Sequence, residues 1–180
     1  MPAADRQSLE YPDGLSPGHG VEAKLPSVLR RLLPTLFLGA IIGASATGIY
    51  GGLKNPEHRA EGSRAALTVN APRVLRNGEF FEMRFRIEAA APLEDATLTI
   101  DETYLHDITV NTMIPQAEKE ESKDGTFSFA YGSLEAGERI DIKLDGQINP
   151  ALFLGTEGTV AVRDGETELA RLPMQLTVLP

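Results

Sequence analysis

The chain has no cysteine among its 180 residues. Disulfide bonds, thiolate metal sites and cysteine nucleophiles are therefore excluded, and an exported domain must be held together by its hydrophobic core alone. Two further signatures are missing: a glycine-rich phosphate loop that opens a helix, and the zinc motif His-Glu-x-x-His. We therefore expect a protein that is not an enzyme and that has no catalytic residues, no cofactor and no metal.

Positive charge is also scarce. The 17 Lys and Arg residues face 26 Asp and Glu residues, which gives a net charge of −9. The imbalance lies in residues 55–180, with twelve basic against twenty-two acidic side chains, whereas residues 1–54 have five against four. Binding to phosphates needs a basic face, so nucleic acid is not expected as a partner.

Charge is absent altogether from residues 32–53, a run of 22 residues between Arg31 and Lys54. A helix of that length rises about 33 Å, enough for a hydrocarbon core of about 30 Å. The run therefore predicts a single transmembrane helix in a lipid bilayer. Arg30 and Arg31 at its start favour a cytoplasmic N-terminus, which places the following domain on the periplasmic or extracellular side of the cytoplasmic (inner) membrane.

Small residues recur at every fourth position of this run. They are Thr35, Gly39, Gly43, Thr47 and Gly51. Such a stripe lets a second helix approach closely, and van der Waals packing then drives association within lipid. We expect this face to pack against another integral membrane protein.

The alternative for this run is a cleavable signal peptide. Ala44-Ser45-Ala46 has the small-x-small form of a cleavage site, so cleavage after Ala46 stays open. The leader before the apolar run, however, is 31 residues long and carries four acids, whereas signal peptides begin with a short basic region. Retention of the helix is the preferred interpretation.

Four segments follow from this division. Residues 1–31 are rich in proline and glycine and predict a flexible cytoplasmic tail. Residues 32–53 are the transmembrane helix, residues 54–63 a polar linker, and residues 64–180 an extracytoplasmic domain.

Residues 64–180 show the alternation that is typical of strands with one wet face. Phe81, Met83, Phe85 and Ile87 alternate with Glu82, Arg84, Arg86 and Glu88. About eight such runs occur between turn residues, and none has the period of a helix. Half-polar strands must pack their apolar faces together, so the sequence predicts an immunoglobulin-like antiparallel β-sandwich.

One segment of this domain carries a resemblance. Residues 127–142 (FSFAYGSLEAGERIDI) have an aromatic strand, then Gly-x-Leu, then x-Gly-Glu, then an alternating strand. This order resembles bacterial Ig-like sandwiches of the CARDB or conserved-repeat type. The resemblance covers about residues 75–150. It implies the fold and a binding or spacing role, and it implies no catalytic residues.

Two loops of the domain are candidate sites. One short loop contains Asp101, Glu102, His106 and Asp107, which could bind a metal or form the active site of an enzyme. Ligands from a single loop lack the fixed geometry of a tight site, so a solvated loop is the preferred interpretation. The mixed-charge run 118–124 predicts a solvated hairpin loop. Another loop, between Pro150 and Gly155, consists of the apolar residues Ala151, Leu152, Phe153 and Leu154. We expect these residues either to pack over the end of the sandwich or to be presented to a partner or to lipid.

The function that these features favour is that of a bacterial, single-pass accessory or interaction subunit of a membrane protein complex. The alternative is a membrane-tethered module that binds a cell-wall polymer, a glycan or an ion. An enzyme with its site in the 101–107 loop is the weakest of the three hypotheses.

Overall fold

A computed structural model describes residues 13, 27–50, 54–152 and 154–180. The chain divides into two compact units, residues 1–43 and 44–180. The expected tail up to residue 26, apart from Asp13, lies outside the described residues, as do Gly51 and Phe153 of the expected sites.

The first element is the helix α1 (Ser27–Ala46). It begins five residues before the expected start at Leu32 and ends seven residues before the expected end at Leu53. The turn that ends it is local: Thr47 N–H bonds to Ala44 O, Gly48 N–H bonds to Ser45 O, and Gly48 takes the left-handed φ of +71° that favours glycine. The helix thus starts before the predicted span and ends within it, and the bounds 32–53 of a membrane span stay a prediction. A pattern of apolar residues alone does not mark this turn.

The apolar side chains of α1 are exposed. None of the residues in its most apolar window, within Val28–Ala46, is buried, and the mean hydropathy of that window is 1.4. The exposed fractions of the larger side chains reach 63% at Leu36 and 70% at Phe37. An apolar helix that is exposed on all sides differs from the helix of a soluble domain, which buries one face.

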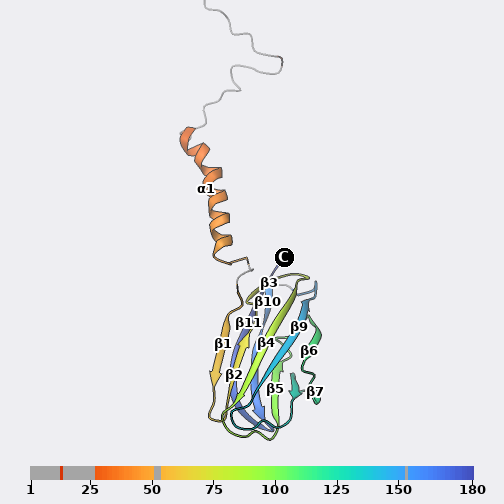
Figure 1. Cartoon of the computed structure of the whole chain (residues 1–180). Coiled ribbons are helices and arrows are strands. Elements are labelled where there is room, and N and C mark those ends of the chain that lie inside the picture. The colour runs from red at the N-terminus through yellow and green to blue at the C-terminus, as the bar shows by residue number, and fades with distance from the viewer. Residues whose placement is uncertain (1–12, 14–26, 51–53, 153) are drawn as a thin grey trace, which may run out of the picture. The chain divides into compact units, whose positions relative to one another are not determined.

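The second unit is a β-sandwich, as predicted (Figure 1). One sheet has five strands in the order β1 (Glu57–Glu61), β2 (Ala65–Asn70), β4 (Phe80–Ala89), β9 (Arg139–Ile148) and β6 (Ile108–Ile114). The other has six, in the order β3 (Val74–Arg76), β11 (Thr167–Leu179), β10 (Leu154–Asp164), β5 (Ala96–Asp101), β8 (Thr126–Ala130) and β7 (Lys119–Lys123). All strand pairs are antiparallel except β3–β11, which is parallel.

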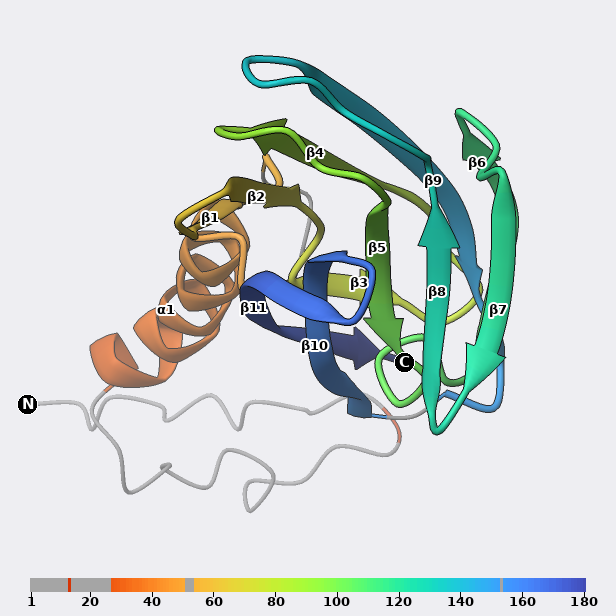
Figure 2. The same cartoon turned by 90° about the horizontal axis from the view of Figure 1, so that it is seen from below.

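The core lies between these two sheets (Figure 2). The predicted alternation in β4 is confirmed, because Phe81, Met83, Phe85 and Ile87 are buried and the intervening charged residues face outward. Leu98 and Ile100 of β5 and Val160 of β10 are buried in the same core. All residues of this core belong to the second unit.

Three strands occur where none was expected. β1 lies inside the predicted linker 54–63, β7 lies inside the predicted solvated loop 118–124, and β3 had no prediction. Each of the three is at the edge of its sheet. An edge strand has water on one side and needs little apolar character, so alternation does not reveal it. The prediction of a polar linker is therefore wrong for residues 57–61, which form β1.

The strands end in two sets of loops. We call the set around the start of β1 the linker end: residues 54–56, 71–80, 102–107, 149–152 and 154, at the top of the sandwich in Figure 1. We call the opposite set the far end: residues 62–64, 90–95, 131–138 and 164–166.

Candidate functional site

Hydrogen bonds join the loops of the linker end into one surface. Asn77 donates its backbone N–H to Leu179 O and its side-chain amide to Pro150 O, both at 2.9 Å. Ile148 N–H bonds to Glu79 O at 3.0 Å. The β3–β4 turn and the β9–β10 loop are therefore held side by side.

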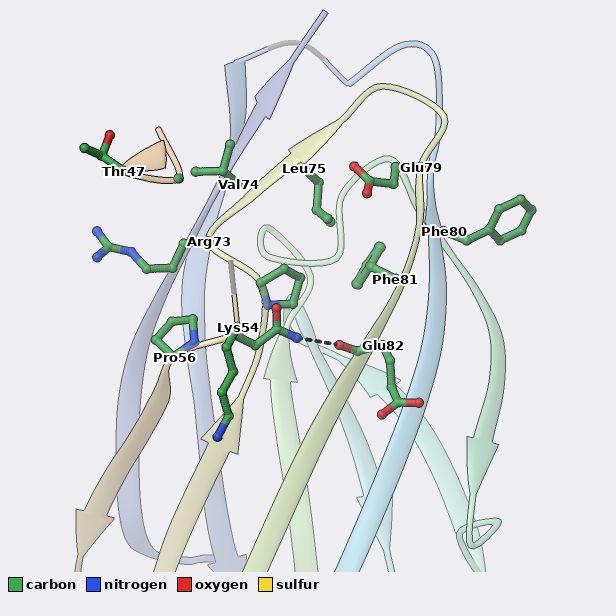
Figure 3. A pocket seen from close by; sticks show the side chains of 13 residues that line it. Thr47, Lys54, Pro56, Arg73, Val74, Leu75, Glu79, Phe80, Phe81 and Glu82 are labelled. Atoms are coloured by element: carbon green, nitrogen blue, oxygen red, sulfur yellow. Dashed lines mark hydrogen bonds between the residues drawn. The ribbon is translucent and has the colours of Figure 1, made fainter. Parts of the chain in front are cut away.

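Two large apolar side chains project from this surface. Phe80 is 70% exposed and Leu154 is 72% exposed, whereas the most exposed large hydrophobic elsewhere in the described part of the sandwich is Ile114 at 58%. Phe80 and Phe81 point to opposite sides of β4, and only Phe81 enters the core (Figure 3). Exposed apolar groups that cluster mark contact sites more often than scattered ones do.

The conformation of Leu154 adds to this. Its φ is +73°, in a region that costs a residue with a side chain about 1–2 kcal/mol relative to glycine. Residues held in such conformations concentrate at functional sites. The backbone of β10 therefore begins in a strained turn that leaves a leucine in water.

The predicted loop 151–154 thus divides in two. Leu152 is only 4% exposed and belongs to the core, as the tucked alternative requires. Ala151 and Leu154 are exposed, as the presented alternative requires.

The linker end also has basic side chains. Lys54, Arg73 and Arg76 are exposed, and none of the three forms an ion pair within the described part of the chain. Two carboxylates lie nearby: Glu79 accepts the backbone N–H of Arg76 at 2.8 Å, and Asp107 lies 3.1 Å from His106 Nδ1.

A cleft of about 510 Å³ is lined by side chains of this end, including Pro56, Arg73, Val74, Phe80 and Phe81 (Figure 3). Asn55 fixes the start of β1 beside it, because its amide donates to Glu82 O at 3.5 Å and its carbonyl accepts from the Asn70 side chain at 3.1 Å. The cleft therefore has apolar walls and charged side chains of both signs, Lys54 and Arg73 together with Glu79 and Glu82.

The outer face of the five-stranded sheet differs, because its charges pair with one another. Arg59 contacts Glu88 at 2.5 Å, and Lys143 contacts both Glu82 and Asp145 at 3.0 and 3.1 Å. Hydrogen bonds first from Arg84 and then from Lys143 lower the pKa of Glu82. A face that neutralises its own charges has little net field with which to attract a charged partner.

The acidic loop 101–107 has structural partners. Asp101 accepts from both the backbone N–H and the hydroxyl of Thr159, each at 2.8 Å. Tyr104 is 1% exposed, its hydroxyl lies 3.7 Å from Met83 Sδ, and burial raises its pKa. No group of three or more potential metal ligands occurs among the described residues.

The predicted helix face is present in part. Thr35, Gly39 and Gly43 lie in α1, and nothing lies within 4 Å of a Cβ placed on either glycine. Thr47 follows the last residue of the helix, and Gly51 lies outside the described residues. The packing of this face against a partner stays a prediction.

Sequence reasoning missed Phe80, Arg73 and Arg76. A signal for Phe80 existed, because an alternation that buries Phe81 must expose its neighbour. No pattern marks the two arginines, because β3, whose pairing with β11 sets Arg76 opposite Leu179, is only three residues long.

Comparisons with known proteins give likenesses of structure only. No protein-family model and no curated protein sequence matches the chain. CaCohA2 from Clostridium acetobutylicum has a TM-score of 0.39 and 15% identity, covering 59% of this chain and 85% of its own. A non-cellulosomal cohesin from Archaeoglobus fulgidus has a TM-score of 0.38 and 11% identity, covering 63% and 91%. The chitin-binding domain of a Pyrococcus furiosus chitinase has a TM-score of 0.33 and 10% identity, covering 65% and 93%. Scores this low carry no functional argument.

Proposed function

We propose that this protein is a single-pass, membrane-anchored interaction subunit of a membrane protein complex, and that it has no catalytic role. Its β-sandwich lies on the periplasmic or extracellular side of the cytoplasmic membrane, and α1 is the anchor. The CARDB-like order of residues 127–142 fits the binding or spacing role that this proposal assigns to the sandwich.

The observation that carries the proposal is that none of the residues in the apolar window of α1 is buried. The 19 residues Val28–Ala46 rise about 28 Å, close to the thickness of a hydrocarbon core. Arg30 and Arg31 lie in the first turns, where long basic side chains extend toward the headgroups. Lipid or a second helix is the environment that removes such a surface from water.

A partner helix is favoured by the small residues of α1. A glycine allows two backbones to approach, and Gly39 and Gly43 have open space beside them. The non-catalytic role is supported by the structural use of the acidic loop, in which Asp101 is bound to Thr159.

The test is co-purification of the full chain from detergent-solubilised native membranes. The double variant Gly39→Leu/Gly43→Leu should lose its partner while remaining in the membrane after alkaline extraction. Ala40→Leu/Ala44→Leu is the matched control, because it adds similar bulk about 100° around the helix. Undiminished co-purification of the glycine variant would remove the packing face, and release of the wild-type chain by alkali would remove the anchor.

A further inference from the structure

We infer that the linker end of the sandwich binds the surface of a bilayer that contains anionic lipids. Phe80 and Leu154 enter the headgroup region, and Lys54, Arg73 and Arg76 face the lipid phosphates. This inference rests on the proposed function, because a chain anchored by α1 keeps this end near a bilayer.

The first step is the distribution of exposed apolar surface. The two most exposed large hydrophobic side chains in the described part of the sandwich, Phe80 and Leu154, are both at the linker end. Asn77 bonds to Pro150 and so joins the turn of Phe80 to the loop of Leu154. Two apolar side chains on one surface are typical of a shallow insertion into the boundary between headgroups and acyl chains.

The second step is charge. Residues 55–180 are strongly acidic, yet the three cations of the linker end have no ion-pair partner among the described residues. Carboxylates also lie at this end: Glu79 accepts the backbone N–H of Arg76, Glu82 pairs with Arg84 and Lys143, and Asp107 lies 3.1 Å from His106 Nδ1. Free cations next to apolar side chains complement a surface of anionic headgroups.

The third step is the length of the chain that precedes β1. Ten residues separate Ala46, the last of α1, from Glu57, the first of β1. Ten residues reach at most about 35 Å, and the turn after Ala46 shortens that reach. The chain therefore enters the sandwich at its linker end, and the ten residues of β4 separate that end from the far end.

Direct binding to vesicles tests the inference. A fragment of residues 54–180 is suitable, because it contains the whole hydrophobic core. We expect it to float with vesicles of phosphatidylcholine and phosphatidylglycerol and not with phosphatidylcholine alone. Each Lys or Arg contributes about fivefold near such a surface, so Arg73→Gln/Arg76→Gln should weaken binding about 25-fold. Equal binding to neutral vesicles, or no effect of the arginine variant, would overturn the inference.

The apolar contribution has its own control. Phe80→Ser and Leu154→Ser should each weaken vesicle binding at least about tenfold, by loss of apolar burial. Ile114→Ser should not weaken vesicle binding, although Ile114 is 58% exposed. Ile114 is remote from the linker end, because it pairs with Lys143 of β9, whereas Phe80 pairs with Gln147, four residues further along that strand. An equal loss in the Ile114 variant would show general stickiness and not a defined surface.

The absence of tryptophan allows a second readout, independent of affinity. Phe80→Trp gives a single emitter, whose fluorescence should shift to the blue and be quenched by brominated lipids when vesicles are added. Ile114→Trp should show neither change. If the tryptophan emission of the Phe80 variant is unchanged by vesicles, the inference is contradicted.

The two proposals fail in different ways. If the full chain resists alkaline extraction but the fragment ignores anionic vesicles, the anchor stands and the lipid-binding surface is refuted. If alkali releases the full chain while the fragment still binds in an arginine-dependent way, the anchor is refuted and the surface is confirmed.

Discussion

The two ends of the sandwich are built differently. At the far end, Asp164 is 9% exposed and one of its oxygens accepts the backbone N–H groups of Glu94 and Asp95, each at 2.9 Å. Its other oxygen contacts Arg64 at 2.8 Å, and Arg64 also donates to Pro92 O at 2.6 Å. At the linker end, Arg73 and Arg76 have no carboxylate partner among the described residues, and two large apolar side chains are in water.

This difference separates stability from function. At the far end Asp164 and Arg64 pair with each other, so these two residues serve the fold. At the linker end, cations lack ion-pair partners and apolar side chains are exposed to water, which is typical of a surface that binds a partner. Substitutions at the two ends should therefore have opposite consequences.

The largest effect is expected at Gly62 at the far end. A Cβ there would lie 1.9 Å from Leu169 O and 3.0 Å from Ala65 O, both backbone atoms that cannot move aside. Gly62→Ala should lower the free energy of unfolding by about 3 kcal/mol in urea denaturation. The control is Gly165→Ala, at which nothing lies within 4 Å and only the φ of +54° is unfavourable, with an expected cost of about 1 kcal/mol. Equal costs would mean that the close contact at Gly62 is absent.

The next effect is the loss of the Asp164 charge. Asp164→Asn retains the shape but removes the charged acceptor, and should lower the free energy of unfolding by about 2 kcal/mol. Glu166→Gln, in the same turn but fully solvent-exposed, should change it by less than about 0.5 kcal/mol. If the two variants are equally stable, the far end is not held by Asp164.

This variant also has a pH dependence. The N–H of Asp95 above all, then that of Glu94 and the Arg64 guanidinium, hold the pKa of Asp164 below its ordinary value against the opposing effect of burial. A depressed native pKa means that the unfolded chain binds the proton first, at about pH 3.9. The stability that Asp164 contributes is thus present above that pH and is lost as the pH falls toward the native pKa. The difference between wild type and Asp164→Asn, measured by urea unfolding, should shrink below about pH 4. A constant difference would contradict this expectation.

The smallest effect, of opposite sign, is expected at Leu154. Leu154→Gly removes the cost of a leucine at a φ of +73°, partly offset by the greater freedom of glycine in the unfolded chain. We expect a gain of about 0.5 kcal/mol in the free energy of unfolding, together with weaker vesicle binding. Leu152→Ala, two residues earlier, should instead cost about 3 kcal/mol because Leu152 is buried. A loss of stability in the Leu154 variant would mean that its side chain serves the fold.

The interior of the fold could be predicted from the sequence because the interior strands alternate. Phe81 to Ile87 face the core as their period of two requires. Two of the edge strands could not be predicted this way: β1 and β7 are composed mostly of charged residues, and their strand structure comes from pairing with β2 and β8. The end of α1 at Ala46 depends on the backbone turn at Gly48, which apolar composition does not reveal.

The candidate site was predictable only in part. Composition identifies the apolar loop 151–154, but it does not tell which side chain enters the core. The hydrogen bond from Leu152 N–H to Asn149 O forms the turn at which Leu152 is buried and after which Leu154 is exposed. Arg76 in β3 is distant in sequence from Leu154 in β10, and the two strands come into one sheet, with β11 between them, only when the chain folds.

The charged edge strand β7 has a consequence for contacts between copies of the protein. A bare, flat strand edge would let copies join into growing sheets. All five side chains of β7 are exposed, and four of them are charged. Lysines and glutamates in that position repel an incoming strand and keep its backbone hydrated. The charged residues that prevent alternation from revealing this strand thus also keep copies of the protein from aggregating through it.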